Sequence, residues 1–133
     1  MSKFTKKEDI KSFEDACAYL DNHALIPNMD SIPEKYRKAI FAHYKLCVIA
    51  EAINKIENEG ESWTPDWSNH SEYKYYPWFD MGSPSGVGFS FGVGAYWSSD
   101  SDCGSRLCFI SRSAAMYAGE QFEEIYKEYF VMG

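Results

Sequence analysis

The first half of the chain alternates hydrophobic and polar positions at the spacing of an α-helix. The segment Thr5–Glu8 matches a capping box and opens an apolar stripe, which predicts a first helix over residues 6–22. A second capping box, Ser31–Glu34, opens a longer stripe and predicts a helix over residues 33–58. Gly60 can take the left-handed conformation that ends a helix. We therefore expect two helices in this half of the chain.

The second half has a different pattern, with short aromatic runs between Gly and Ser residues. Alternation predicts strands over residues 72–79, 88–91, 95–98 and 106–111. A last apolar stripe, capped by Ser111 or Ser113, predicts one helix over residues 113–131. The expected fold is α+β, with two N-terminal helices and one C-terminal helix packed on a small antiparallel β-meander of three or four strands.

Length and composition favour a single domain over residues 1–133, because 45% of the 133 residues are hydrophobic and only 25% are charged. It would comprise a helical part (about 6–60), an aromatic and Ser/Gly-rich β part (about 61–111) and the C-terminal helix (about 113–131). This composition excludes a disordered chain, a collagen and a coiled-coil rod. No apolar run reaches the ~18 residues of a membrane span, and the first residues predict no signal peptide.

The net charge of −7 disfavours non-specific binding to duplex DNA, which basic proteins grip through phosphate. Arg106 and Arg112 stand out in the acidic second half and flank the strand expected at 106–111. Arg112 also precedes a helix N-terminus, where free amides favour an anion. Either a phosphate-bearing ligand binds there, or the two arginines pair with neighbouring carboxylates.

The four cysteines are expected to stay reduced, with Cys17 and Cys47 as small buried hydrophobic residues. The His and Cys spacing matches no metal site, so we expect no metal and no cofactor. A Ser/His/Asp arrangement around Asp66 and His70 is of the kind that arises by chance. Cys103 or Cys108 as a thiol nucleophile is an equally weak prediction, so no catalytic residue is assigned.

The segment 80–105 combines thirteen Ser and Gly residues with aromatic side chains, among them Tyr96 and Trp97. Rigid aromatic rings beside small adaptable residues are typical of recognition loops. Tyr96 and Trp97 would be the anchors of such a surface. The alternative is that the aromatic residues form the inner face of the meander.

A second aromatic cluster includes Tyr75, Tyr76 and Trp78, on which a nucleotide base could stack. Alternation along the strand would place Tyr75 on one face and Tyr76 and Trp78 on the other. Core packing against the long helix is the alternative for this cluster.

Several motifs together resemble a family of small uncharacterised proteins of gut Bacteroides genomes, prophages and phages. They are Ala52–Asn54, Trp63–Trp67, Lys74–Phe79, Gly88–Phe89, Gly104–Phe109, Ser111–Arg112 and Tyr117–Phe122. The resemblance covers most of residues 8–130 and implies a mobile-element context, in a bacterial cytoplasm or a virion, with no established activity. The short piece Tyr96–Ser99 is also similar to a motif of lectin-like variable proteins diversified by phage retroelements.

The leading hypothesis is a non-enzymatic binding protein of a phage or mobile element that recognises a protein partner or ligand through its aromatic, Ser/Gly-rich surface. A second is a counter-defence protein that sequesters a nucleotide signal through Arg106 and Arg112. A virion component and a small enzyme are the remaining alternatives, and a homo-oligomer is compatible with all of them.

Overall fold

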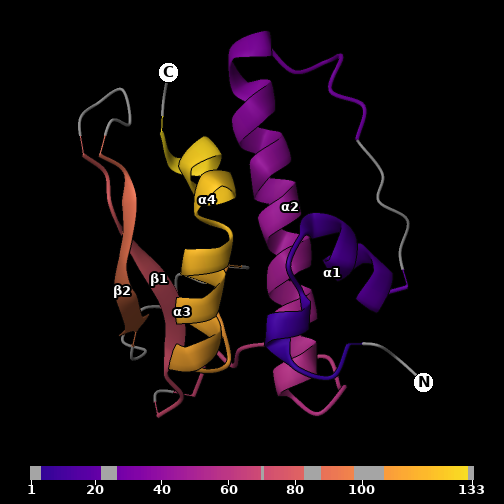
Figure 1. The fold of residues 1–133 in the computed structure, drawn as a ribbon, viewed down its shortest axis with the longest axis vertical. Coiled ribbons are helices and arrows are strands. Elements are labelled where there is room, and N and C mark those ends of the chain that lie inside the picture. Colours follow the sequence, from indigo (N-terminus) through magenta and orange to yellow (C-terminus); the bar gives the residue numbers. More distant parts are fainter. Residues whose placement is uncertain (1–3, 22–26, 70, 83–87, 98–106, 132–133) are drawn as a thin grey trace.

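The structure is a computed structural model that describes residues 4–21, 27–69, 71–82, 88–97 and 107–131. In chain order the elements are a 3-10 helix η1 (Lys7–Asp9), α1 (Phe13–Tyr19), α2 (Glu34–Glu57), β1 (Lys74–Asp80), β2 (Ser90–Trp97), α3 (Arg112–Gln121) and α4 (Glu123–Phe130). The sheet forms one outer layer, α3 and α4 lie behind it, and α2 and then α1 follow (Figure 1). The fold is α+β, as the sequence predicts, but the arrangement of elements differs in three places.

The first difference is at the N-terminus, where the helix predicted over 6–22 is interrupted. The Asp9 carboxylate accepts hydrogen bonds from the backbone amides of Thr5 (2.9 Å) and Lys6 (3.1 Å) and closes a separate turn at η1. The α-helix begins only after Ser12, whose hydroxyl accepts from the Asp15 amide at 3.0 Å. The predicted helix is therefore divided into this short turn and α1, each with its own N-terminal cap.

The long helix α2 confirms the prediction over 33–58 to within one residue at each end. Pro33 precedes it with a φ of −52°, and no side chain caps its N-terminus, so the second predicted capping box does not form. Gly60 adopts a φ of +85°, and its amide donates to the Lys55 carbonyl at 2.8 Å, but Glu59 before it also has a positive φ of 58°, so the left-handed end of the helix begins one residue earlier than predicted. None of the described helices is both long and apolar enough to cross a membrane.

The second difference is in the sheet, which has two strands where a meander of three or four was predicted. The two short strands expected over 88–91 and 95–98 merge into the single strand β2, which pairs antiparallel with β1. The strand expected over 106–111 is reduced, in the part that the structure describes, to a bridge between Phe109 and Tyr75.

The third difference is at the C-terminus, where the helix predicted over 113–131 divides into α3 and α4 at Phe122. Phe122 has φ and ψ of −112° and 27°, outside the helical region, and its ring is buried. The division has a clear consequence for packing. Helix α3 lies against both strands, whereas α4 turns to lie along α2, and one straight helix would not serve both neighbours.

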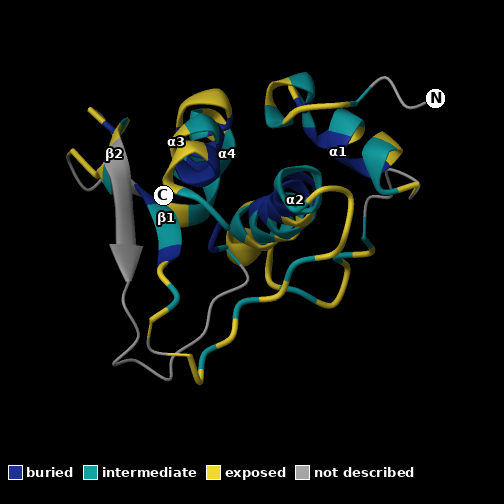
Figure 2. Ribbon diagram, turned by 90° about the horizontal axis from the view of Figure 1, so that it is seen from below, coloured by how far each residue is buried: buried dark blue, intermediate teal, exposed yellow. Residues whose placement is uncertain are grey.

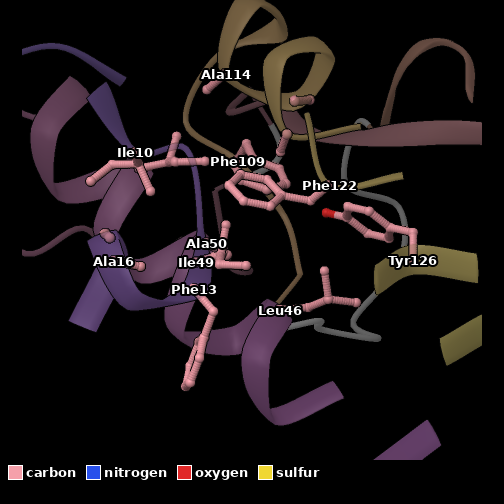
Figure 3. Close-up of a cluster of buried hydrophobic side chains, with 14 of the residues drawn as sticks. Ile10, Phe13, Ala16, Leu46, Ile49, Ala50, Phe109, Ala114, Phe122 and Tyr126 are labelled. Atoms are coloured by element: carbon pink, nitrogen blue, oxygen red, sulfur yellow. The ribbon is translucent and has the colours of Figure 1, made fainter. Parts of the chain in front are cut away.

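The core surrounds α2, with the N-terminal residues and α1 on one side and the two C-terminal helices on the other, and Figure 2 shows buried residues on α2, α3 and α4. Figure 3 shows Ile10, Phe109 and Phe122 converging on one another, with Leu46, Ile49 and Ala50 of α2 below them. Helix α3 lies close to the sheet because the residues on its buried face are Ala and Gly. A Cβ atom on Gly119 would overlap the Phe91 ring and stand 2.8 Å from Cβ of Pro77.

Candidate functional site

The aromatic residues that were predicted to stack on a base lie on one strand, β1. Tyr75 and Tyr76 are both half-buried. Tyr75 packs against the core, and its backbone exchanges two hydrogen bonds with Phe109, of 3.3 and 2.7 Å. Successive residues of a strand point to opposite faces, so Tyr75 and Tyr76 do not share one stacking surface.

The two predicted anchors, Tyr96 and Trp97, are the last two residues of β2, and each is paired with a residue of β1. Tyr96 is paired with Tyr75, and Trp97 is paired with Lys74. The side chains of Tyr96, Trp97 and Trp78 lie outside the described part of the structure. The sheet therefore brings the two predicted aromatic clusters side by side along the backbone.

Of the two predicted anion-binding arginines, Arg106 lies outside the described residues. Arg112 is the first residue of α3; its side chain is exposed and forms no ion pair with a described residue. The preceding Ser111 hydroxyl caps the helix by accepting from the Ala114 amide (3.1 Å) and lies 3.4 Å from the Glu57 carboxylate. A negative side chain thus already stands beside this helix N-terminus.

The structure adds a feature that the sequence did not predict, a pocket of about 520 Å³ between α2 and residues 62–67. Its lining comprises Tyr44, Cys47, Val48, Glu51 and Asn54 from one face of α2, Ser62, Trp63, Thr64, Pro65 and Trp67 from the loop, and Cys108. A volume of this size lies within the roughly 300–1,000 Å³ of small-molecule sites. Three aromatic rings and one carboxylate, that of Glu51, dominate its chemistry.

The loop that carries Trp63 and Trp67 is fixed by Lys74, whose side chain is completely buried. The Lys74 ammonium donates to the backbone carbonyls of Asp66 (2.6 Å), Asn69 (3.1 Å) and Glu72 (3.1 Å). It also pairs with the Glu72 carboxylate at 3.2 Å, and that carboxylate accepts from the Asp66 amide at 2.8 Å. A buried charge is tolerated because every donor finds an acceptor. The loop is therefore held from inside.

The helix side of the pocket is fixed by Asn54, the one buried uncharged polar residue of the described chain. Its amide nitrogen donates to the Cys108 carbonyl at 3.0 Å, and its amide oxygen accepts from the Ile110 backbone at 2.9 Å. The side chain thus acts as a short strand partner for residues 108–110. Buried polar contacts therefore hold both walls of the pocket: those of Lys74 hold the loop, and those of Asn54 hold the helix side.

The two thiols of the pocket differ in environment. Burial raises the pKa of Cys108 to about 11, so the group is a neutral thiol at pH 7 and a poor nucleophile. Cys47 is half-buried, against the expectation of a fully buried residue, because it faces the pocket; Cys17 is buried as expected. The Cys47 sulfur lies 3.5 Å from Nε2 of His43, whose buried Nδ1 has no hydrogen-bond partner among the described residues. No cluster of His, Cys, Asp and Glu among the described residues could hold a metal ion.

The residues of this pocket belong to two motifs that are separate in the sequence. The two Trp residues around Pro65 and the Ala52–Asn54 motif both entered the family resemblance, some ten residues apart. The fold brings Asn54 of this motif and the two Trp residues into the lining of one pocket. In comparisons with known proteins, the chain matches no protein-family model, no curated protein and no solved structure.

Proposed function

We propose that this chain is a non-enzymatic binding protein of a phage or related mobile element, and that it takes a ligand into the pocket between α2 and residues 62–67. The observation that carries the proposal is the preformed aromatic lining. Tyr44, Trp63 and Trp67 line one hollow of about 520 Å³. Large rings on a fixed frame bind with little loss of conformational entropy.

Binding is favoured over catalysis because of the state of the groups in the pocket. The Cys108 thiol keeps its proton at neutral pH, and the polar atoms of Asn54 are engaged with the backbone. A Cys–His pair needs a third group to orient the imidazole, and Nδ1 of His43 has no such partner in the described chain. Of the thiols considered from the sequence, Cys103 lies outside the described residues and Cys108 is protonated, so an enzyme working in this pocket would have to use Cys47 and show turnover that a Cys47→Ser variant loses.

Native mass spectrometry of the freshly purified protein, compared with its denatured mass, tests the proposal. We expect an added mass that disappears on denaturation and that is absent from a Trp63→Ala/Trp67→Ala variant. Tyr36→Ala is the matched control, because Tyr36 is an exposed aromatic residue of α2 outside the pocket. A bare protein mass, together with unchanged thermal stability across a library of metabolites, contradicts a ligand-binding function.

A second candidate is recognition of a protein partner through the segment 80–105, with Tyr96 and Trp97 as anchors. The observation that favours it is the register of the sheet, in which Tyr96 is paired with Tyr75 and Trp97 with Lys74. The end of β2 therefore lies beside the aromatic strand β1. Replacing both anchors by Ala should abolish capture of the partner and leave the melting temperature unchanged. Binding that survives, or a variant that unfolds, contradicts this assignment.

The nucleotide and virion alternatives stay proposals with distinct signatures. A sequestered nucleotide predicts an added mass of a few hundred daltons that is lost in Arg106→Ala or Arg112→Ala. The described pocket lining contains no Lys, Arg or His, so a nucleotide would bind elsewhere. A virion component predicts self-assembly, seen as a defined oligomer in the same spectrum.

A further inference from the structure

We propose that the pocket selects a small organic cation, a quaternary or protonated ammonium group on an apolar body. This inference rests on the proposed function and names the class of ligand. Its starting point is Glu51, the charged residue of the described lining. The Glu51 side chain is exposed, and it forms no ion pair with a described residue, so its charge is available to a ligand.

The basic residues of α2 that could neutralise Glu51 are turned elsewhere. Lys55, at the i+4 position where a helical ion pair would form, lies over the Tyr19 ring with its ammonium 5.7 Å from the ring centre. Lys45, six residues before Glu51, is on another face of α2 and lies over the Phe41 ring at 4.3 Å. The carboxylate therefore faces the pocket without a cation from its own helix.

The charged side chains that hold the loop carry a net negative charge. Lys74 is the cation there, and its ammonium is satisfied by three carbonyls and by Glu72 at 3.2 Å. Hydrogen bonds from the Ser68 hydroxyl and amide lower the pKa of Asp66, which therefore stays ionised. With Glu51, Glu72 and Asp66 set against Lys74, the field attracts a cation and repels an anion.

The aromatic lining supplies the second element of cation recognition. The faces of Trp and Tyr rings carry negative charge density and attract ammonium groups within about 6 Å of the ring centre. Trp67 already holds the Lys74 ammonium 5.2 Å from its ring centre, so this loop presents a ring to a cation in the resting fold. Both polar atoms of Asn54 are engaged with the backbone, so this side chain does not take part in recognition, and Glu51 with the rings carries the selection for a cation.

The test uses a charged probe and its neutral isostere, choline and 3,3-dimethylbutan-1-ol, titrated into the ¹⁵N-labelled full chain. The readout is the indole N–H resonances, assigned with single Trp→Phe variants. We expect choline to shift the Trp63 and Trp67 resonances saturably and to bind roughly tenfold more tightly than the alcohol. Glu51→Gln should weaken this preference several-fold and leave only the part that the aromatic rings supply, whereas Glu124→Gln, which changes the net charge equally on exposed α4 surface, should keep it in full.

Three results would count against the inference in different ways. Equal affinities for choline and the alcohol, or a preference that Glu51→Gln leaves undiminished, overturn the choice of a cation held by Glu51 and leave a binding pocket in place. If choline shifts only the indole resonances of other Trp residues, the cation binds outside this pocket. If neither probe moves the Trp63 and Trp67 signals and the purified protein carries no added mass, the proposed function fails as well.

Discussion

The ammonium group of Lys74 lies 5.2 Å from the centre of the Trp67 ring, and this contact joins the first residue of β1 to the wall of the pocket. The same ammonium gathers three backbone carbonyls of the loop over residues 66–72. One buried side chain thus couples the fold of the sheet to the shape of the candidate site. Loss of Lys74 should therefore affect the pocket as well as stability.

Lys74→Met should lower the free energy of unfolding by about 2–4 kcal/mol, because it leaves buried carbonyls and the Glu72 carboxylate without their donor. Chemical denaturation measures this loss, and hydrogen exchange should show faster opening of residues 66–72. Lys38→Met is the control: its pair with Glu128 at 3.7 Å is exposed and should contribute less than about 1 kcal/mol. Equal effects of the two substitutions would contradict the anchoring role of Lys74.

Asn54→Leu should cost about 2–3 kcal/mol, since the apolar side chain leaves the Cys108 carbonyl and the Ile110 amide without partners. Asn54→Asp keeps the acceptor for the amide but turns a carboxylate oxygen toward the carbonyl, so it should not rescue stability. Asn58→Ala is the comparison, because Asn58 also bonds the backbone through its amide nitrogen (3.1 Å to the Glu61 carbonyl) but at an exposed site. Thermal melts of the three variants would show whether burial sets the cost; a loss for Asn58→Ala as large as for Asn54→Leu would argue that it does not.

How far the sequence predicts the fold depends on whether the signal is local. Helix α2 and the left-handed turn after it, which includes Gly60, follow from periodicity and backbone conformation, both of which act within a few residues. The division at Phe122 does not, because it is set by two different neighbours, the sheet for α3 and α2 for α4. The apolar stripe of α2 shows the same limit: Tyr36 and Ile40 belong to it but are 48% and 41% exposed, since the described chain places no layer over them.

The candidate site was less predictable for a related reason. A lysine within an aromatic strand resembles a solvent-facing residue, and the three carbonyls that allow Lys74 to be buried come from a loop with no periodic pattern. Trp63 and Trp67 are visible in the sequence, but their partners Glu51 and Asn54 belong to the apolar helix before them. Only the turn after α2 makes them neighbours.

Gly119→Ala should destabilise the protein by about 1–3 kcal/mol through overpacking. The added methyl group would overlap the Phe91 ring and press on Pro77, and both belong to strands fixed against α3. Glu120→Ala, at the next and exposed position of the same helix, should change stability by less than about 0.5 kcal/mol. If Gly119→Ala melts at the wild-type temperature, α3 is not seated against the sheet as described.

The cysteines should react with iodoacetamide at pH 8 in an order set by burial. Cys47 lines the pocket and is half-buried, whereas Cys17 and Cys108 are 2% and 4% exposed and have a raised pKa. Peptide mapping of the native protein should find Cys47 labelled well before the other two, and a bound ligand should slow its labelling. Addition of denaturant should make all three rates similar. Cys108 labelling as fast as Cys47 in the native state would mean that the pocket opens to the core.

Alkaline pH should weaken the fold through Cys108. Its thiol pKa is about 11 in the folded protein and near 9.0 in the unfolded chain, so the buried neutral form contributes its full stability below pH 9. Between pH 9 and 11 the unfolded chain loses the proton while the folded protein keeps it, and stability falls. Tyr117, with a pKa raised to about 12, extends the decline to higher pH. Denaturation curves from pH 7 to 11 should therefore show a shallower decline for Cys108→Ala than for the wild type, and parallel declines would show that this thiol does not titrate differently on folding.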